Sequence, residues 1–202
     1  MLPRVYPIVD AEKFSSSREL LDFARKLVSG GATLLQYRNK YGSARQILSD
    51  ARNLRLVSGE GVRWIMNDRA DLCLAAGFDG VHVGQDDLSP ESARMVVKAG
   101  KWVGVSSHSL EQALAADTTS ADYIAIGPIF KTRSKDRPDP VVGLEGLRKV
   151  RAGTRKPLVA IGGITLANCR SVIDTGADSV AIISALLPSP CKRVEDFIRV
   201  LM

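Results

Sequence analysis

The chain has 202 residues, of which 45% are hydrophobic and 25% charged, and its formal net charge is +6. This composition is typical of a globular protein and excludes a disordered, collagen-like or coiled-coil chain. No stretch approaches the roughly 20 apolar residues that a membrane span needs, and the first residues lack the charged and apolar regions of a signal peptide. We therefore expect a cytoplasmic protein that has no membrane partner.

The cysteines and the basic residues exclude two further classes of protein. The three cysteines lie far apart without a C-x-x-C spacing, so neither a disulfide framework nor a zinc site is predicted. Lysine and arginine are scattered along the chain, with no block of like charges. Because a concentrated basic surface and a reading motif are both missing, we do not expect a nucleic-acid partner. A phosphorylated small molecule is compatible with the positive charge.

Short aliphatic and β-branched runs alternate along the chain with longer segments whose apolar residues have helical spacing. We expect eight strands, over 5–9, 33–37, 62–66, 80–83, 102–105, 123–126, 158–161 and 179–183. The helices expected after them cover 20–28, 44–57, 70–75, 89–99, 110–116, 144–150, 166–175 and 194–201. Glycines at 30–31, 77 and 176 stand where helices end, as is typical of left-handed C-caps.

The order of these elements predicts a single α/β domain over residues 1–202. Strands that read as continuous apolar runs are typical of a parallel sheet covered by helices on both faces. Eight such units, of about 25 residues each, close into a (βα)8 TIM barrel near the lower size limit of that fold. An open dinucleotide-binding sheet would need a glycine-rich turn after the first strand, where the chain reads DAEK. Active sites of TIM barrels lie at the carboxyl ends of the strands, so the functional residues of this chain are expected there.

The second strand is followed by cations and amides. The run is Gln36, Tyr37, Arg38, Asn39 and Lys40. An arginine fork and a lysine point charge both suit phosphoryl oxygens, so this run is a candidate diphosphate site. A solvated loop is the alternative.

Acidic residues follow the third and fourth strands. Asn67 and Asp68 come after one, and Asp87 lies a few residues after the other. Two carboxylates at neighbouring strand ends suit Mg²⁺, which takes one or two carboxylates and completes its shell with water and phosphates. The alternative is that each aspartate caps the helix that follows it.

Both histidines lie near the same rim. Ser106 and His108 follow the fifth strand, but no base stands at the spacing of a catalytic triad, so a serine nucleophile is not predicted. His108 could either start the next helix or transfer a proton. His82 lies inside the fourth strand, and we expect it to be an interior side chain bonded to a polar neighbour.

The longest irregular segment runs over 127–143 and carries alternating cations and hydroxyls. These are Lys131, Thr132, Arg133, Ser134 and Lys135. A loop longer than about 12 residues in a compact domain is usually functional or disordered, and this one could form a lid over a charged substrate. A charged surface loop is the alternative.

Paired glycines end the seventh strand at Gly162 and Gly163, and the eighth strand ends in Ile183 and Ser184. TIM barrels often bind a phosphate with the loops after strands seven and eight, where glycines let backbone N–H groups approach the oxygens. We therefore predict a second anion site here.

Taken together, these motifs closely resemble those of the thiamine-phosphate synthase family, from residue 6 to residue 185. They read QYRNK at 36–40, NDRAD at 67–71, HVGQDD at 82–87, GVS at 104–106, GPIF at 127–130, GL at 143–144, IGGI at 161–164 and IS at 183–184. Several independent motifs in the same order are far more specific than any single one.

The resemblance implies a Mg²⁺-dependent transferase that joins aminomethyl-pyrimidine diphosphate to thiazole phosphate, giving thiamine phosphate and pyrophosphate. It implies that pyrophosphate departs first and that the thiazole nitrogen captures the pyrimidine carbocation. By similarity, Asp68 and Asp87 hold Mg²⁺, and the pyrimidine diphosphate is held by Gln36, Arg38, Lys40, Asn67, Ser106 and Lys135. The thiazole phosphate is held by Thr132, Ser134, Gly163, Ile183 and Ser184. Tyr37, Asn39 and Arg133 complete the expected substrate-binding set, and the expected catalytic residues are Arg38, Lys40, Ser106 and Lys135.

The chain departs from the family at Lys131, where proline is more common, and at Ser134, where threonine is more common. One alternative is the thiazole tautomerase paralogue, which shares the barrel and the phosphate site. Asp68, Asp87 and Pro128 favour the synthase, since better-known tautomerases carry histidine at the place of Pro128. A second alternative is a non-catalytic barrel that senses a thiazole or thiamine phosphate. A homodimer is compatible with an apolar helical outer ring.

Overall fold

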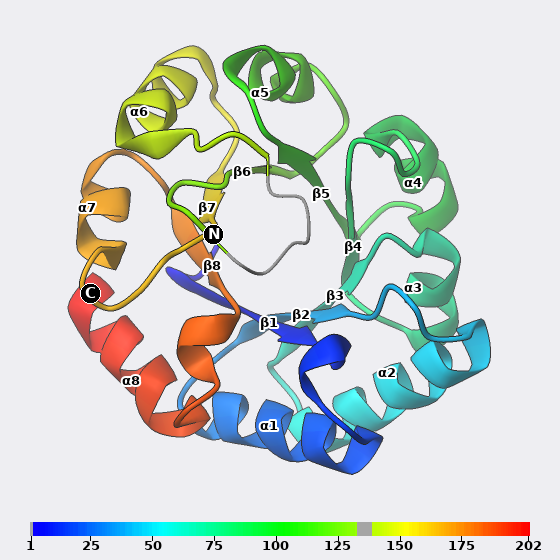
Figure 1. Ribbon diagram of the computed structural model, residues 1–202. Coiled ribbons are helices and arrows are strands. Elements are labelled where there is room, and N and C mark those ends of the chain that lie inside the picture. The colour runs from blue at the N-terminus through cyan, green and yellow to red at the C-terminus, as the bar shows by residue number, and fades with distance from the viewer. Residues whose placement is uncertain (1, 133–138) are drawn as a thin grey trace.

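The computed structural model describes residues 2–132 and 139–202, which form a closed barrel of eight parallel strands inside a ring of helices (Figure 1). The strands are β1 (Val5–Asp10), β2 (Leu34–Arg38), β3 (Arg63–Asn67), β4 (Gly80–Val83), β5 (Trp102–Ser107), β6 (Tyr123–Ile126), β7 (Leu158–Ile161) and β8 (Ser179–Ile182). Each strand pairs with the next in the sequence, and β8 closes the barrel on β1. The predicted (βα)8 barrel is confirmed.

The helices follow the strands one by one. They are α1 (Ser17–Ser29), α2 (Ala44–Ser58), α3 (Ala70–Ala76), α4 (Pro90–Val97), α5 (Leu110–Asp117), α6 (Gly143–Gly153), α7 (Cys169–Asp174) and α8 (Pro190–Leu201), with 3₁₀ turns η1 (Ala11–Lys13) and η2 (Ser184–Leu186). Serine side chains cap α1, α2, α4 and α5, which satisfies donors that a helix start leaves free. Gly77 ends α3 in the left-handed conformation, as predicted.

The strands extend into polar residues that the apolar runs did not include. Asp10 pairs with Arg38 across β1 and β2, and Ser106 and Ser107 pair with β6. Backbone pairing continues past the last apolar residue because it does not depend on the side chain. The polar residues at the strand ends are therefore held by the sheet itself.

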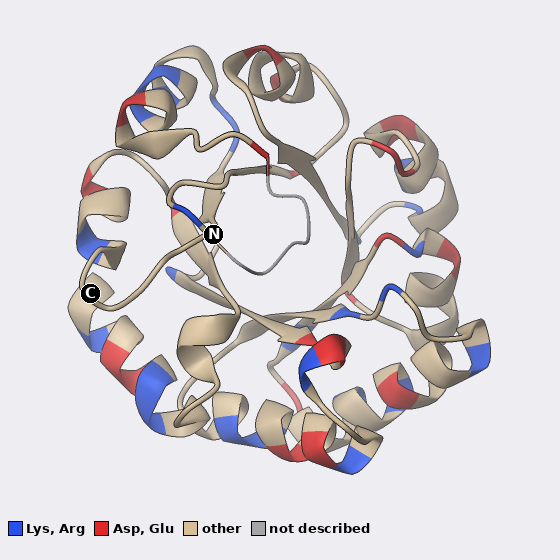
Figure 2. Cartoon of the chain, in the orientation of Figure 1, with Lys and Arg blue, Asp and Glu red and all other residues tan. Residues whose placement is uncertain are grey.

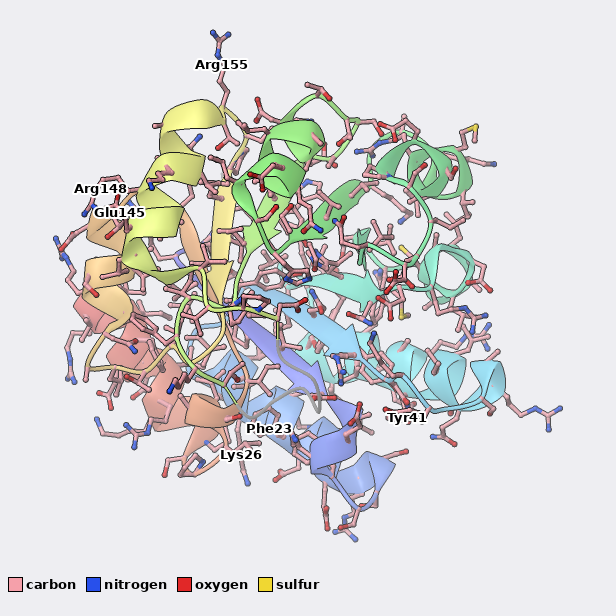
Figure 3. All side chains as sticks on the ribbon, turned by 45° about the horizontal axis from the view of Figure 1, so that its top comes forward. Phe23, Lys26, Tyr41, Glu145, Arg148 and Arg155 are labelled. Atoms are coloured by element: carbon pink, nitrogen blue, oxygen red, sulfur yellow. The ribbon has the colours of Figure 1, made fainter. Side chains whose placement is uncertain are left out.

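Charges of both signs alternate over the outer helices (Figure 2). On α6, for example, Arg148 and Glu145 form an ion pair of 2.5 Å, and Figure 3 shows them together on the outer side of the helix. No helix within 2–132 or 139–202 has the length and apolar character that crossing a membrane requires.

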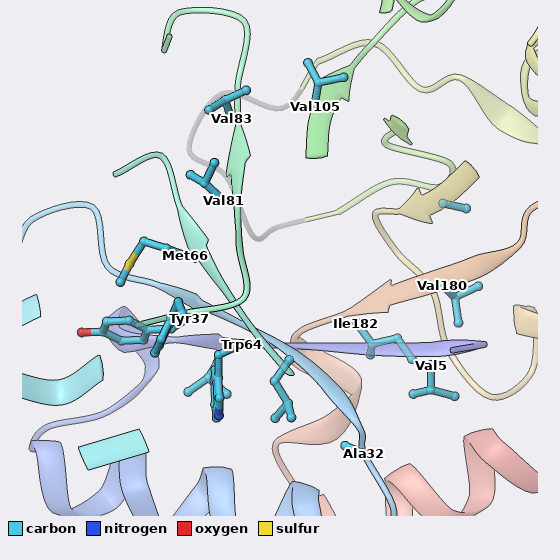
Figure 4. Close-up of a cluster of buried hydrophobic side chains, with 14 of the residues drawn as sticks. Val5, Ala32, Tyr37, Trp64, Met66, Val81, Val83, Val105, Val180 and Ile182 are labelled. Atoms are coloured by element: carbon cyan, nitrogen blue, oxygen red, sulfur yellow. The ribbon is translucent and has the colours of Figure 1, made fainter. Parts of the chain in front are cut away.

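Two layers of buried side chains lie on the two faces of the sheet. The outer layer packs between strands and helices and includes the fully buried Leu27, Leu54 and Phe197. In Figure 4, Tyr37 and Trp64 point from their strands into this layer. The inner layer fills the barrel and consists of Leu2, Tyr6, Ile8, Leu34, Ile65, Tyr123, Ala125, Val159 and Ala181. Alternation along each strand divides the residues between the two layers.

Candidate active site

Three charged side chains meet at the carboxyl ends of β2, β3 and β4. Lys40 Nζ lies 3.5 Å from Asp68 Oδ2, and the side chains of Asp68 and Asp87 face each other closely enough to interact. The register that pairs Asn67 with His82 brings the ends of β3 and β4 level. Burial and the neighbouring Asp87 raise the pKa of Asp68 from its ordinary value of 3.8 to about 6, although Lys40 opposes this. A cation placed between the two carboxylates would therefore favour their charged forms.

Neither aspartate caps a helix, although the sequence left that reading open. Helix α4 is capped by Ser89, whose side chain accepts from the Ser92 amide, and α3 begins without a side-chain cap. Asp87 instead accepts from the Gly84 amide at 2.8 Å. Asp68 has a φ of 62°, in the left-handed region that aspartate and asparagine enter more readily than other side chains. Its amide is fixed by a hydrogen bond to the His82 carbonyl at 2.8 Å.

The chemistry of this pair fits a hard divalent cation. Mg²⁺ binds through one or two carboxylates and fills the rest of its shell with water and substrate phosphates. Within the described ranges, no group of three or more histidine, cysteine or acidic side chains could form a larger metal cage. The two facing carboxylates suit such a cation, and they would leave its other coordination positions to water and phosphoryl oxygens.

Gln36 and Arg38 point into the barrel mouth from β2. Arg38 Nη1 forms ion pairs with Asp10 at 2.8 Å and with Glu12 at 2.7 Å, partners that the sequence did not reveal. Because the guanidinium has five donors and both ion pairs use Nη1, donors remain for a ligand. Gln36 is buried and donates from Nε2 to the Tyr6 hydroxyl at 3.1 Å.

Tyr37 and Asn39 lie elsewhere. The Tyr37 hydroxyl donates to Asp50 on α2 at 2.9 Å, in the outer layer, and Asn39 donates to Tyr37 at 3.1 Å while accepting from the Gly42 amide. These contacts shape the loop after β2. The direct substrate contact that we expected of these two residues stays a prediction.

Asn67 and Ser106 present polar atoms to the barrel mouth. The Asn67 Nδ2 atom is buried and has no hydrogen-bond partner within the described chain. Leaving a buried donor unpaired is costly, so a ligand that accepts from it would be favoured. Ser106 Oγ lies 2.9 Å from His82 Nε2.

The two histidines have different surroundings. His82 is bonded to Tyr123 and Ser106, as the sequence predicted for an interior side chain. Burial lowers its pKa from 6.5 to about 4, so it is neutral at pH 7. His108 does not start a helix, since Ser109 caps α5. Its Nδ1 lies 2.7 Å from the Gly127 carbonyl and 3.4 Å from the Asp139 carboxylate.

The predicted phosphate site lies at the ends of β7 and β8. Gly162 and Gly163 have φ of 96° and 66°, and a Cβ on them would lie 2.6 Å from the Pro128 side chain and from the Lys131 carbonyl. These glycines therefore have a packing role that the sequence did not indicate. Ile183 and Ser184 lead into η2, in the place where short extra helices bind phosphate in many TIM barrels.

The predicted lid is only partly described. Lys131 and Thr132 lie within the described residues, and the Lys131 carbonyl lies beside Gly163. Arg133, Ser134 and Lys135 lie outside them, so their expected roles are not tested.

Comparison with known proteins agrees with these motifs. The family model described as thiamine monophosphate synthase matches residues 5–186. A protein of Koribacter versatilis named thiamine-phosphate synthase is 61% identical over 203 residues, covering 99% of this chain and 96% of its own length. One of the same name from Chloroflexus aurantiacus is 44% identical, covering 91% and 85%. The solved structure of a thiamine phosphate pyrophosphorylase from Pyrococcus furiosus superimposes with a TM-score of 0.87 at 34% identity, covering 98% of this chain and 95% of that one. The chain belongs to the thiamine monophosphate synthase family.

Proposed function

We propose that the carboxyl end of this barrel joins aminomethyl-pyrimidine diphosphate to thiazole phosphate, giving thiamine phosphate and pyrophosphate. Family membership and the names of the relatives support an alkyl-transferring enzyme of thiamine biosynthesis. The observation in this chain that carries the proposal is the pair of facing carboxylates, Asp68 and Asp87, beside Lys40.

The diphosphate would lie at the ends of β2 to β5. Lys40 and the remaining donors of Arg38 would bind phosphoryl oxygens, and the unpaired amide of Asn67 would gain an acceptor. Asp68 and Asp87 would hold Mg²⁺, which supplies positive charge to the diphosphate as it leaves. We place Lys135 in the same role on the strength of the family motif.

The thiazole phosphate would lie at the ends of β7 and β8. Backbone N–H groups of Gly163 and of the turn from Ile183 to Ser184 suit phosphate oxygens there. Thr132 directly follows Lys131, whose carbonyl lies beside Gly163, and the family motif adds Thr132, Ser134 and Arg133 to this site. The two anions would then enter opposite sides of one barrel mouth.

This chemistry needs no side-chain nucleophile. Departure of pyrophosphate creates negative charge on the leaving group. Cations that are already in place stabilise that charge and so lower the barrier. The barrel rim holds the two substrates in line, which removes much of the entropic cost of their encounter. Neutral His82 bonds to Ser106 and does not act as a strong base.

We place the enzyme in the cytoplasm, since the three cysteines are free, which suits a reducing compartment. The homodimer is a proposal from the sequence alone. Size-exclusion chromatography coupled to light scattering would measure it.

The direct test incubates the purified protein with both phosphorylated substrates, in Mg²⁺ or in EDTA, and separates the products by chromatography. We expect thiamine phosphate and pyrophosphate in equal amounts, in Mg²⁺ only. Isomerisation of a thiazole carboxylate phosphate without these products would instead identify a tautomerase. Binding of thiazole phosphate without turnover would identify a sensor.

A further inference from the structure

A continuous chain of hydrogen bonds crosses the barrel interior beneath the proposed site. It joins two predicted substrate-binding residues, Gln36 on β2 and Ser106 on β5, through side chains of β1, β6 and β4. The links are Gln36 Nε2 to Tyr6 OH at 3.1 Å, Tyr6 OH to Tyr123 OH at 3.0 Å, Tyr123 OH to His82 Nδ1 at 3.1 Å, and His82 Nε2 to Ser106 Oγ at 2.9 Å. Tyr6 and Tyr123 belong to the inner layer, whose other members are aliphatic, and they link the polar side chains of Gln36, His82 and Ser106 into a relay of five residues.

A glycine makes the central contact of the relay possible. Gly104 on β5 pairs with His82 on one side and with Tyr123 on the other. A Cβ at Gly104 would lie 2.1 Å from Tyr123 Cζ and 2.5 Å from His82 Nδ1. Glycine inside a strand weakens it and often marks a close approach. Here it lets the tyrosine ring reach across β5 to the imidazole.

The protons along the relay have one favoured direction. The Gln36 amide donates to Tyr6, so the Tyr6 proton is free for Tyr123, and the Tyr123 proton is then free for His82 Nδ1. In the reverse arrangement the Tyr6 proton would have no acceptor among the described residues, at the cost of a buried unpaired donor. Neutral His82 accepting at Nδ1 carries its proton on Nε2 and donates it to Ser106. The Ser106 hydroxyl proton remains available to a ligand.

We propose that Tyr6 and Tyr123 are positioning residues that act through His82 to present the Ser106 hydroxyl as a donor to a phosphoryl oxygen, while holding Gln36 in place. The inference rests on the proposed function for the identity of that oxygen. The hydroxyls act by fixing one tautomer of His82. Neither tyrosine touches the substrate in this account.

Tyr123→Phe breaks the relay and keeps the ring. Without the tyrosine proton, His82 Nδ1 has no donor, and the imidazole is free to take the tautomer that accepts from Ser106. The serine proton would then turn away from the substrate. We expect kcat/KM for the pyrimidine diphosphate to fall about tenfold, as for one lost hydrogen bond to a charged group, with KM for thiazole phosphate unchanged.

A double-mutant cycle separates this role from a general loss of stability. In a Ser106→Ala background, Tyr123→Phe should cause no further loss of kcat/KM. Ser58→Ala is the matched control, because it removes a buried hydroxyl of the outer layer that accepts from Trp64 Nε1 at 2.9 Å. It should lower Tm without changing kcat/KM. Equal losses from Tyr123→Phe in both backgrounds would overturn the proposal.

Nitrogen-15 NMR of the histidine side chains tests the relay without any substrate. The chain has only two histidines, so a change confined to one of them is easily followed. At pH 7 we expect the wild-type His82 ring to carry its proton on Nε2, and Tyr123→Phe to shift its signals while those of His108 stay in place. A wild-type His82 protonated on Nδ1 would overturn the relay even in an active enzyme. A missing reaction would contradict the proposed function and would leave this measurement unaffected.

Discussion

The outer and inner layers of this barrel are built from different chemistry. Outer-layer positions such as Leu27, Leu54 and Phe197 are apolar and fully buried, so their stabilisation depends on area and shape. The inner layer contains a hydrogen-bonded relay that ends at the rim. A directional network adds little net stability compared with a well-packed apolar core. We infer that the outer layer determines the fold, whereas the relay in the inner layer positions side chains for chemistry.

The largest effect should follow Asp68→Asn. Replacing a charged ligand of the proposed Mg²⁺ site should reduce kcat by about a hundredfold or more, because the leaving group loses its positive partner. Asparagine tolerates the positive φ of this position, so the fold should be kept. The measurement is the rate of thiamine phosphate formation at saturating substrates.

The same variant has a control that does not depend on activity. Mg²⁺ should raise the Tm of the wild-type protein, since a ligand that binds only the folded state stabilises it. It should not raise the Tm of Asp68→Asn. An equal Mg²⁺ shift in both proteins would remove Asp68 from the metal site.

Leu54→Ala should have the largest effect on stability. Its side chain is fully buried in the outer layer, and truncating a buried leucine costs about 2–5 kcal/mol. Urea unfolding measures the change in the free energy of unfolding. The kcat of the remaining folded protein should be unchanged. A large fall in kcat would contradict the separation of a stabilising outer layer from a catalytic rim.

Gly104→Ala tests the narrow place in the inner layer. The added Cβ conflicts with Tyr123 and His82, so we expect a loss of about 2–3 kcal/mol from overpacking, together with a loss of activity. Gly153→Ala is the matched control, since its Cβ meets only the flexible end of the half-exposed Leu114. We expect that control to change stability by less than about 1 kcal/mol. Similar effects of the two substitutions would contradict the packing argument.

The smallest effect concerns pH. The pKa of Asp68 is raised in the folded state to about 6, so between pH 4 and pH 6 this carboxyl binds more protons in the folded protein than in the unfolded chain. Its contribution to the free energy of unfolding in EDTA therefore falls as pH rises through this window, whereas buried His82, with its lowered pKa, contributes in the opposite direction. Comparison of the wild type with Asp68→Asn isolates the Asp68 contribution. Urea unfolding of both proteins at pH 4.5 and pH 7.5 measures it: the wild type should lose stability relative to Asp68→Asn as the pH rises, and the same change in both proteins would show that the pKa of Asp68 is not raised.

Much of the fold could be predicted because each βα unit has a signal in its own short stretch of sequence. Apolar runs and glycine C-caps such as Gly77 predicted every strand and helix of the barrel, and mainly the ends differed. Helix α7 is shorter than predicted because Asn168 accepts from the Thr165 amide in a turn before it. Such side-chain turns compete with the first turn of a helix.

The site could be predicted only where motifs lie at strand ends. Asp68, Asp87 and Lys40 do meet, because the carboxyl ends of parallel strands share one rim. The partners of Arg38 and the relay through Tyr6 were missed, since they join strands that are distant in the sequence. The alternation of side chains along a strand does predict that Tyr37 lies on the opposite face of the sheet from Gln36 and Arg38.

The most direct test compares catalysis with stability in two variants, by measuring kcat/KM and Tm for Asp68→Asn and Leu54→Ala beside the wild type. The account predicts that Asp68→Asn is nearly inactive with an undiminished Tm, and that Leu54→Ala has a much lower Tm with near-normal kcat/KM below its transition. If instead activity followed Tm in both variants, the division between a fold-determining outer layer and a catalytic rim would be wrong.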